Sequence, residues 1–246
     1  MRKVGKLAAQ LLDLFVDEVK PGITTESLDC FAYEFIKDNG AIPAPLNYRG
    51  FKKSICTSIN HVICHGIPGD RVLDEGDIVN IDVTLILDGW HGDTSRMYSA
   101  GNPSVKARNL INNTYEAMMK GINLIKPGVK LGDLGFVIQK HAETNNYSVV
   151  KEFCGHGLGK VFHDEPNILH YGVEDTGLSL QEGMFFTVEP MVNIGKPESK
   201  ILSDGWTAVT RDRSLSAQFE HSIGVTSDGV EIFTRSLNKR ANPIEN

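Results

Sequence analysis

The sequence has no long apolar run and no cluster of basic residues. No apolar stretch approaches the roughly 20 residues that a membrane-spanning helix needs, and Asp13, Asp17 and Glu18 interrupt the apolar N-terminus where a signal peptide would have its core. Lys and Arg number 25 against 31 Asp and Glu, which gives a net charge of -6. An unclustered, acidic balance argues against a nucleic-acid or membrane partner. We therefore expect a cytoplasmic protein.

Cysteines are few, and their spacing is not that of a zinc-binding motif. The four cysteines are Cys30, Cys56, Cys64 and Cys154, and no CxxC pair occurs. In a cytosolic chain of this size they are most simply reduced thiols. A zinc site built from Cys56, Cys64 and Cys154 is the alternative, which the missing CxxC disfavours. The G-x-G-x-x-G order of nucleotide loops and the G-x-S-x-G of a nucleophile elbow are also absent.

What the chain does contain is an internal repeat. Its 246 residues are 41% hydrophobic, with no low-complexity tract or linker, which predicts one domain over residues 1–246. The segment from Leu73 to Asp82 aligns with the segment from Leu180 to Glu189, 107 positions later, and Lys20-Pro-Gly matches Lys126-Pro-Gly. We therefore expect two related halves, approximately 1–103 and 104–246, each with early helices and a later strand that carries an acid.

The first half contains a predicted hairpin with two acids on one face. Apolar residues at helical spacing predict helices over residues 4–19, 24–37, 105–125 and 131–144. Residues 78–87 instead alternate as a strand, Asp88-Gly89 is a two-residue turn signal, and residues 90–98 form the returning strand. That turn places Thr84 opposite Asp93, so Asp82 lies diagonal to Asp93 at roughly 7 to 8 Å. Two carboxylates at that distance can share a metal ion.

The second half repeats this polar face. Thr187 and Glu189 point away from their apolar neighbours, and Glu220 does the same within residues 217–225. Asp204-Gly205-Trp206 repeats Asp88-Gly89-Trp90 and predicts a second hairpin-like turn before Glu220. A single acid on a strand face is usually only solvated. Four acids on the faces of two related hairpins would repel one another unless a cation lay between them, which predicts a metal site.

Three histidines stand in unusual surroundings. His156 lies within Gly155-His-Gly-Leu-Gly159, where side-chain-free backbone allows close approach, His163 follows seven residues later, and His65 precedes Gly-Ile-Pro. From spacing alone each could equally be a surface, core or turn residue. Their roles stay open at this point.

These segments together resemble the type I methionine aminopeptidases of the short bacterial form, over essentially the whole chain. The matching segments are Cys64-His-Gly-Ile-Pro68, Asn80-Ile-Asp-Val83, Asp88-Gly-Trp-His-Gly-Asp-Thr-Ser95, Gly155-His-Gly157, Thr187-Val-Glu-Pro190 and Ser216-Ala-Gln-Phe-Glu-His221. The resemblance implies an α+β chain with the pita-bread fold, in which pseudo-symmetric halves build an antiparallel sheet backed by helices. It implies removal of the initiator methionine from nascent proteins that have a small second residue.

The resemblance also implies a dinuclear metal centre. Its ligands would be Asp82, Asp93, His156, Glu189 and Glu220. Asp93 and Glu220 would bridge two divalent ions (Mn, Fe, Co or Zn), Asp82 would complete one site, and His156 with Glu189 the other. A metal-activated hydroxide would attack the scissile carbonyl. Glu189 would act as proton shuttle, His163 would donate a hydrogen bond to the oxyanion, and His65 would contact the scissile amide nitrogen.

Further residues follow from the same resemblance. Besides His65 and His163, the substrate pocket would draw on Tyr48, Phe51, Cys56, Phe162 and Trp206. Asn60, Val62 and Ser216 match positions that bind a monovalent cation through backbone carbonyls in relatives. The expected partners are nascent polypeptide N-termini, with association to the ribosome as an option, and the expected state is a monomer.

Two departures and three rivals accompany this interpretation. Lys52 stands where the family often has proline, and the chain opens inside its first long helix, without the short leader expected there. An aminopeptidase P or prolidase usually carries an additional N-terminal domain, and a noncatalytic pita-bread adaptor would have lost ligands. Type II enzymes carry an insertion that is not visible between Glu189 and Glu220.

Overall fold

The computed structural model describes residues 1–238. Its helices are α1 (Arg2–Glu18), α2 (Thr25–Asp38), α3 (Val105–Leu124) and α4 (Leu131–Thr144), with a short 3-10 turn, η1, at Tyr48–Gly50. Each long helix begins and ends within two residues of its predicted bounds. The N-caps explain the starts, because Thr24 accepts a hydrogen bond from the backbone N–H of Ser27 and Ser104 accepts one from Ala107.

Strands fill most of the remainder of both halves. The first half contains β1 (Ile42–Pro43), β2 (Cys56–Ile59), β3 (Val62–Cys64), β4 (Ile78–Leu87) and β5 (Trp90–Ser99). The second half contains β6 (Ser148–Val149), β7 (Gly155–Gly157), β8 (Asp164–Ile168), β9 (Phe185–Val188), β10 (Met191–Asn193), β11 (Ser199–Ile201), β12 (Ala208–Thr210), β13 (Ser216–Gln218), β14 (Glu220–Val225) and β15 (Val230–Ile232). The strands combine into one large sheet, with backbone order β1-β4-β5-β14-β9-β7-β8, and two small ones.

The predicted hairpin in the first half is confirmed. Strands β4 and β5 pair antiparallel with Thr84 opposite Asp93 and Asp82 opposite Ser95. Asp88 and Gly89 both adopt positive φ, 52° and 78°, as a two-residue turn with right-handed strand twist requires. Asp82 and Asp93 therefore share one face of the sheet.

The second half differs from its prediction in connectivity. Strand β9 does pair with β14, with Thr187 opposite Ser222, but no tight turn joins them. The Asp204-Gly205-Trp206 turn lies instead between β11 and β12, which belong to a separate three-stranded sheet. Pro190 follows Glu189 directly and has no N–H to extend the ladder. The chain therefore makes a detour through β10 to β13 before it returns as β14.

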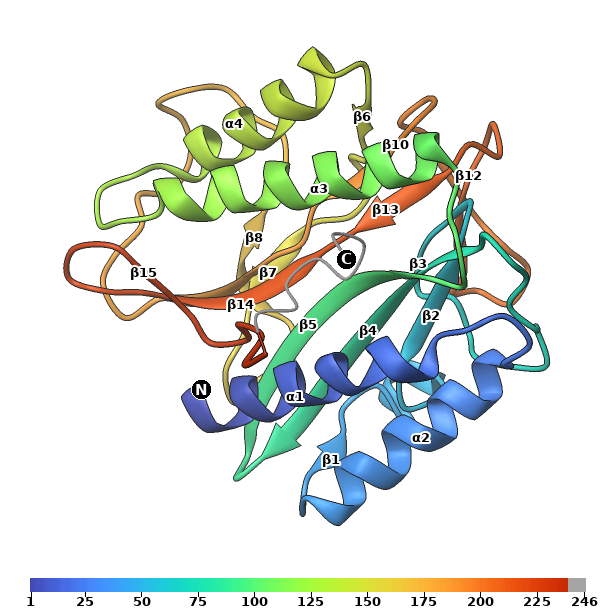
Figure 1. The fold of residues 1–246 in the computed structure, drawn as a ribbon. Coiled ribbons are helices and arrows are strands. Elements are labelled where there is room, and N and C mark those ends of the chain that lie inside the picture. Colours follow the sequence, from blue (N-terminus) through green and yellow to red (C-terminus); the bar gives the residue numbers. More distant parts are fainter. Residues whose placement is uncertain (239–246) are drawn as a thin grey trace.

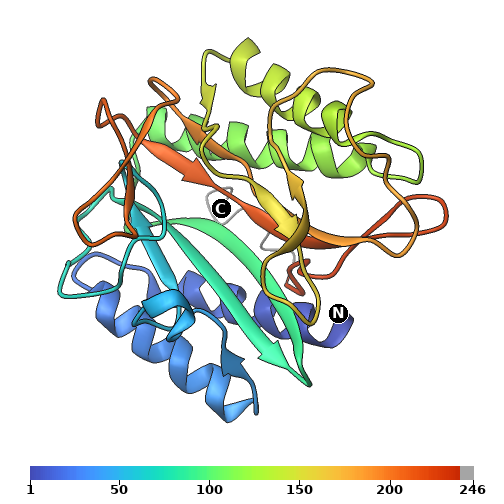
Figure 2. The same ribbon diagram turned by 180° about the vertical axis from the view of Figure 1, so that it is seen from behind.

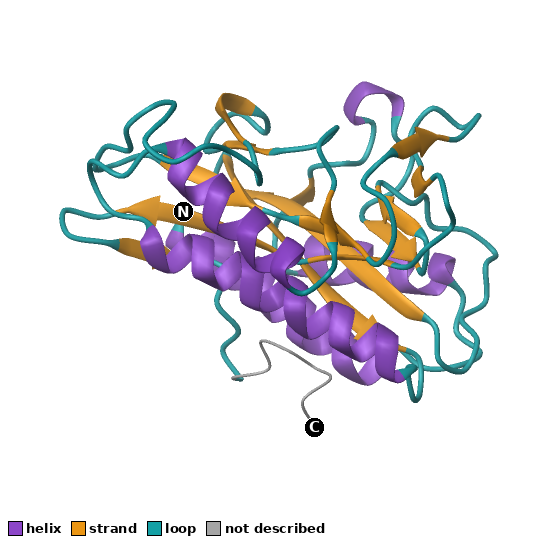
Figure 3. Cartoon of the chain, turned by 90° about the horizontal axis from the view of Figure 1, so that it is seen from above, coloured by secondary structure: helices purple, strands orange, loops and turns teal. Residues whose placement is uncertain are grey.

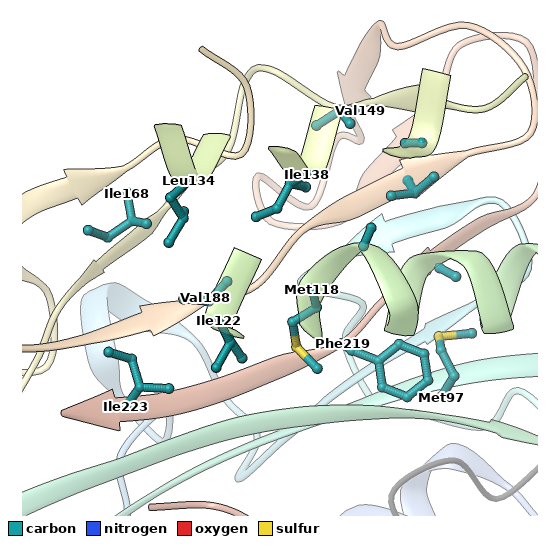
Figure 4. Packing of buried hydrophobic residues seen from close by; sticks show 14 of the residues in the cluster. Met97, Met118, Ile122, Leu134, Ile138, Val149, Ile168, Val188, Phe219 and Ile223 are labelled. Carbon is teal, nitrogen blue, oxygen red and sulfur yellow. The ribbon is translucent and has the colours of Figure 1, made fainter. Parts of the chain in front are cut away.

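The helices cover one side of the large sheet, as Figure 3 shows. In Figures 1 and 2, α1 and α2 lie against β4 and β5, while α3 and α4 lie over the strands of the second half. Odd-numbered residues of β4, from Val79 to Leu85, pack with α1 and α2, and Figure 4 shows the matching cluster, in which Met118 and Ile122 of α3 meet Phe219 and Ile223. Even-numbered β4 residues therefore face away from the helices. No helix within residues 1–238 has the length and apolar character to cross a membrane.

Candidate active site

A cavity of about 380 Å³ opens on the sheet face opposite the helices. Asp82 and Thr84 of β4 line it, as expected from strand parity, together with Asp93 of β5. All five residues expected as metal ligands line this cavity: Asp82, Asp93, His156, Glu189 and Glu220. Residues from both halves of the chain thus meet in one site.

The carboxylate of Asp93 is fixed by its neighbours on the sheet. Its Oδ1 accepts a hydrogen bond from Thr84 Oγ1 at 2.6 Å. Its backbone N–H donates to Ser222 Oγ at 3.1 Å, and the Ser222 hydroxyl donates back to the Asp93 carbonyl at 2.6 Å. Ser222 belongs to β14, so these bonds lock the first half against the second at the site.

Glu189 is held at both carboxylate oxygens. Thr187 Oγ1 donates to Oε1 at 2.7 Å, and Gln218 Nε2 lies 3.3 Å from Oε2. Its backbone N–H donates to Nε2 of buried His170 at 3.0 Å, so that imidazole carries its proton on Nδ1. The sequence patterns assign no role to His170, and Gln218 appears in them only as a member of the segment from Ser216 to His221. Their contacts arise only from the fold.

His156 presents one ring nitrogen to the acids. Its Nδ1 lies 3.0 Å from the Gly157 carbonyl, while Nε2 lies 3.5 Å from Asp93 Oδ2 and 3.7 Å from Glu189 Oε1. The flanking Gly157 allows β8 to pack closely against β7, since a Cβ on Gly157 would stand 2.2 Å from the Glu165 carbonyl. Single ligand atoms of Asp93, His156 and Glu220 all lie within 4.8 Å of one another.

Mutual charge and burial shift the acids strongly. Burial raises the pKa of Asp82 and of Glu220 well above the carboxyl range, and the charge of Asp93 adds to both shifts. Burial also raises the pKa of Glu189 to about 7, against the opposing effect of His156. Burial alone would lower the pKa of His156, but Asp93 and Glu189 raise it to about 9. Such a cluster binds positive charge readily.

The residues present fit divalent cations. Within residues 1–238 the only cationic side chain within 4.0 Å of these acids is His156. Its Nδ1–H can donate to the Gly157 carbonyl, which leaves the Nε2 lone pair toward the carboxylates, as in metal-binding histidines. Carboxylate oxygens with one imidazole form a donor set suited to Mn, Fe, Co or Zn.

The two other expected histidines line the same cavity. His65 adopts a positive φ of 56°, its ring lies 6.2 Å from that of Trp206, and burial lowers its pKa. His163 Nδ1 lies 3.0 Å from Tyr48 Oη, and its ring centre is 4.3 Å from that of His156. Burial, followed by the charge of His156, lowers the pKa of His163 to about 4. Both imidazoles are therefore neutral at pH 7.

The expected side-chain pocket is assembled from aromatic rings. Phe51 meets Trp206 edge to face at 5.2 Å, and Tyr48 meets Phe162 at 4.9 Å. Buried Cys56 completes the lining, and burial raises the pKa of its thiol. The cavity also includes residues to which the sequence patterns assign no place in it, namely Pro45, Arg49, Glu152, Phe153, Cys154 and Met191. Phe153 and Cys154 immediately precede Gly155, so adjacency to the Gly-His-Gly motif was the one available signal.

His91 is another contributor, to which the sequence analysis assigns no role. Its backbone N–H donates to the Gly159 carbonyl at 2.8 Å, and its Nδ1 lies 2.9 Å from the same oxygen. Its ring stacks on Phe162 at 5.4 Å with 17° between the planes. His91 thus anchors the loop that carries Phe162 and His163.

The remaining sequence hypotheses concern thiols and a monovalent ion. All four cysteines are free, and within residues 1–238 no metal-binding group includes Cys56, Cys64 or Cys154, which removes support for the zinc alternative. The Asn60 carbonyl accepts a hydrogen bond from the Ser216 N–H at 2.8 Å, so two of the three residues predicted to bind a monovalent cation are adjacent. The cation itself stays a prediction.

Comparisons with known proteins agree with this geometry. The model of metallopeptidase family M24 matches residues 1–227. The methionine aminopeptidase of Rickettsia prowazekii is 64% identical over 241 residues, covering 97% of this chain and 93% of the relative. A crystal structure of methionine aminopeptidase from that organism superposes with a TM-score of 0.95 at 63% identity, covering 96% of this chain and 95% of that one.

A more distant comparison concerns the fold alone. The prolidase from Pyrococcus furiosus superposes with a TM-score of 0.75 at 21% identity, over 96% of this chain but 62% of the prolidase. The pita-bread fold that the resemblance implied is thereby confirmed. The prolidase alternative is disfavoured, because the methionine aminopeptidases match at far higher identity. The chain belongs to metallopeptidase family M24 and, within it, to the methionine aminopeptidases.

Proposed function

We propose that this protein removes the N-terminal methionine from polypeptides whose second residue is small. The cavity combines an aromatic and thiol-lined region with a cluster of buried acids. A thioether suits such walls, since contacts between sulfur and aromatic rings contribute about 0.3 to 1.5 kcal/mol each. We place the methionine side chain against Tyr48, Phe51, Cys56, Phe162 and Trp206. The free amino group then points toward the acids.

Asp82, Asp93, His156, Glu189 and Glu220 would hold two divalent cations. When bound, such cations polarise a carbonyl group and lower the pKa of water from 15.7 toward roughly 7. Four carboxylates carry about the opposite charge of two divalent ions, which supports a pair rather than one. Asp93 and Glu220, one from each half, would bridge the pair.

The chain's own residues then orient the substrate and move protons. Glu189, held by Thr187 and Gln218, would carry a proton toward the leaving amine. A Tyr48 hydroxyl that donates to His163 Nδ1 leaves a proton on Nε2, which would donate a hydrogen bond to the developing oxyanion. His65, beside Trp206, would contact the scissile amide nitrogen.

We extend the proposal to the setting of the reaction. The substrates would be nascent polypeptides in the cytoplasm, met at or near the ribosome by a monomeric enzyme. A monovalent cation at the carbonyls of Asn60, Val62 and Ser216 would support the turn beside β3. The acidic balance of the sequence is consistent with the absence of nucleic-acid and membrane partners.

The observation that carries the proposal is the convergence of five ligand-type side chains, four buried and Asp82 half-buried, beside an aromatic pocket. The test is hydrolysis of Met-Gly-Met-Ser and of Ala-Pro peptides, with and without chelator, alongside a metal count per chain. We expect chelator-sensitive release of methionine, near two metals per chain, and no cleavage of the Pro peptides. Cleavage of Ala-Pro peptides alone would indicate a proline-directed enzyme instead.

A further inference from the structure

One arginine lies among the acids and rings of the cavity lining. Arg49, in η1, is the only Lys or Arg among the described residues that line the cavity, and its side chain is exposed to solvent. An exposed residue that also lines the cavity stands at its entrance. A substrate chain must pass this entrance when its N-terminus lies at the acids.

The turn that carries Arg49 has a strained backbone that hydrogen bonds hold in place. Asn47 and Arg49 adopt φ of 66° and 46°, a left-handed region that costs energy for residues other than glycine. The turn is closed by hydrogen bonds from Tyr48 N–H to the Pro45 carbonyl at 2.9 Å and from Phe51 N–H to the Tyr48 carbonyl at 2.9 Å. Strain at a pocket entrance is commonly retained for function.

The guanidinium lies beside another residue that lines the cavity. It lies 5.3 Å from the ring centre of Tyr48, at cation–π distance. Tyr48 is itself fixed by the contact between its hydroxyl and His163. The charge of Arg49 reaches inward, where it contributes to the lowered pKa of His163.

Arg49 has no acidic partner within residues 1–238, since no carboxylate lies within 4.0 Å of its guanidinium. Lys53, four residues later, is paired with Glu26. Glu152 also lines the cavity, but its carboxylate oxygens accept backbone N–H groups of Lys151 and Ser199. The entrance therefore offers an uncompensated planar donor that matches carboxylate geometry.

We propose that Arg49 is a specificity-determining residue that favours substrates with an acidic third residue. The inference rests on the proposed function, because it needs the methionine in the aromatic pocket and the second residue at the acids. Each further extended residue advances at most about 3.3–3.6 Å, and we place the third residue at the entrance beside Arg49. An exposed ion pair supplies a modest gain, so a preference of roughly threefold is expected.

The test compares kcat/KM for Met-Ala-Glu-Ser, Met-Ala-Gln-Ser and Met-Ala-Lys-Ser in the holoenzyme. The wild type should prefer Glu over Gln by roughly threefold, and Arg49→Gln should bring that ratio to about one. Arg49→Lys should keep part of the preference, and Arg49→Glu should favour the Lys peptide. The preference of the wild type should fall as salt is raised.

Lys52→Gln is the matched control. Lys52 is exposed in the same loop but does not line the cavity, so its replacement removes the same charge without the contact. Equal Glu and Gln rates in the wild type, or an equal loss of preference in the Lys52 variant, would overturn the assignment. Failure to hydrolyse even Met-Ala-Gln-Ser would instead contradict the proposed function, and this inference with it.

Discussion

At the scale of single residues, Glu189 is buried and has partners on both carboxylate oxygens. We expect Glu189→Gln to lower kcat by about 10² to 10⁴, because the amide cannot transfer a proton. Some metal should remain, since an amide oxygen still coordinates. Steady-state kinetics with a metal count checks this, with exposed Glu182→Gln as control. Normal kcat in the Glu189 variant would remove it from the mechanism.

His65 offers a second test at this scale. Its imidazole lines the cavity but lies in no metal-binding group among residues 1–238. His65→Ala should therefore lower the rate by about 10² to 10⁴ while the metal content stays unchanged. His61→Ala, in the same segment but outside the cavity lining, should leave the rate near that of the wild type. Loss of metal from the His65 variant would assign that residue a structural role.

At the scale of elements, one carboxylate ties α2 to the loop that forms the pocket wall. Buried Asp29 accepts hydrogen bonds through Oδ1 from the backbone N–H groups of Ser54 at 2.7 Å and Ile55 at 3.2 Å. These residues lie between Phe51 and Cys56, which both line the cavity. The helix therefore determines where the pocket wall stands.

Asp29→Asn should destabilise the protein by about 1–3 kcal/mol, because the N–H donors of the new amide would be buried without hydrogen-bond acceptors. Burial raises the pKa of Asp29 above its ordinary value. A carboxyl group whose pKa is higher in the folded than in the unfolded protein stabilises the fold most when the pH is below its ordinary pKa, near 3.9. This contribution to the free energy of unfolding declines as the pH rises through the folded-state pKa. The deficit of the variant should thus be larger at pH 4 than at pH 7.

Urea unfolding of the wild type and the Asp29 variant across that pH range measures the difference in their free energies of unfolding. The KM of the variant for Met-Gly-Met-Ser should also rise, because the loop that forms the pocket wall becomes less firmly held. Exposed Asp38→Asn on the same helix is the control. A deficit that grew toward pH 7 would reverse the assigned direction of the pKa shift.

Elements also divide what the sequence could predict from what it could not. Strict alternation and Asp88-Gly89 determine β4 and β5 locally, so the shared face of Asp82 and Asp93 was derivable. The pairing of β9 with β14 spans more than 30 residues and four other strands, so the local signal at Asp204-Gly205 could not show that this turn joins β11 to β12. Arg49 lies in a short 3-10 turn without periodicity, and His91, although in β5, contacts the Gly159 carbonyl and Phe162 only through the tertiary fold.

At the scale of the whole molecule, the site joins two halves of the chain. We expect chelator to lower the thermal stability, because a ligand at 100 times its Kd stabilises the folded state by about 2.7 kcal/mol. For a chain of this length that corresponds to roughly 5–10 °C in Tm. Calorimetry with and without metal measures the shift.

Glu220→Gln provides the comparison for that measurement. It removes a carboxylate from the group formed with Asp93 and His156, so its chelator-dependent shift should be clearly smaller. An equal shift in both proteins would place the stabilising ion elsewhere.

The joint between the halves has a mechanical consequence. Strands β5 and β14 share two register pairs, Glu220–Ser95 and His221–Thr94, beside the hydrogen bonds of Ser222 to Asp93, whereas β4 and β5 share ten register pairs. A cation bound by Asp93 of β5 and Glu220 of β14 would hold these two strands together. When the metal-free protein is pulled in optical tweezers, β5 and β14 should separate before other strand pairs. The supply of metal ions in the cell would then govern resistance to forced unfolding by degradation machines as well as turnover.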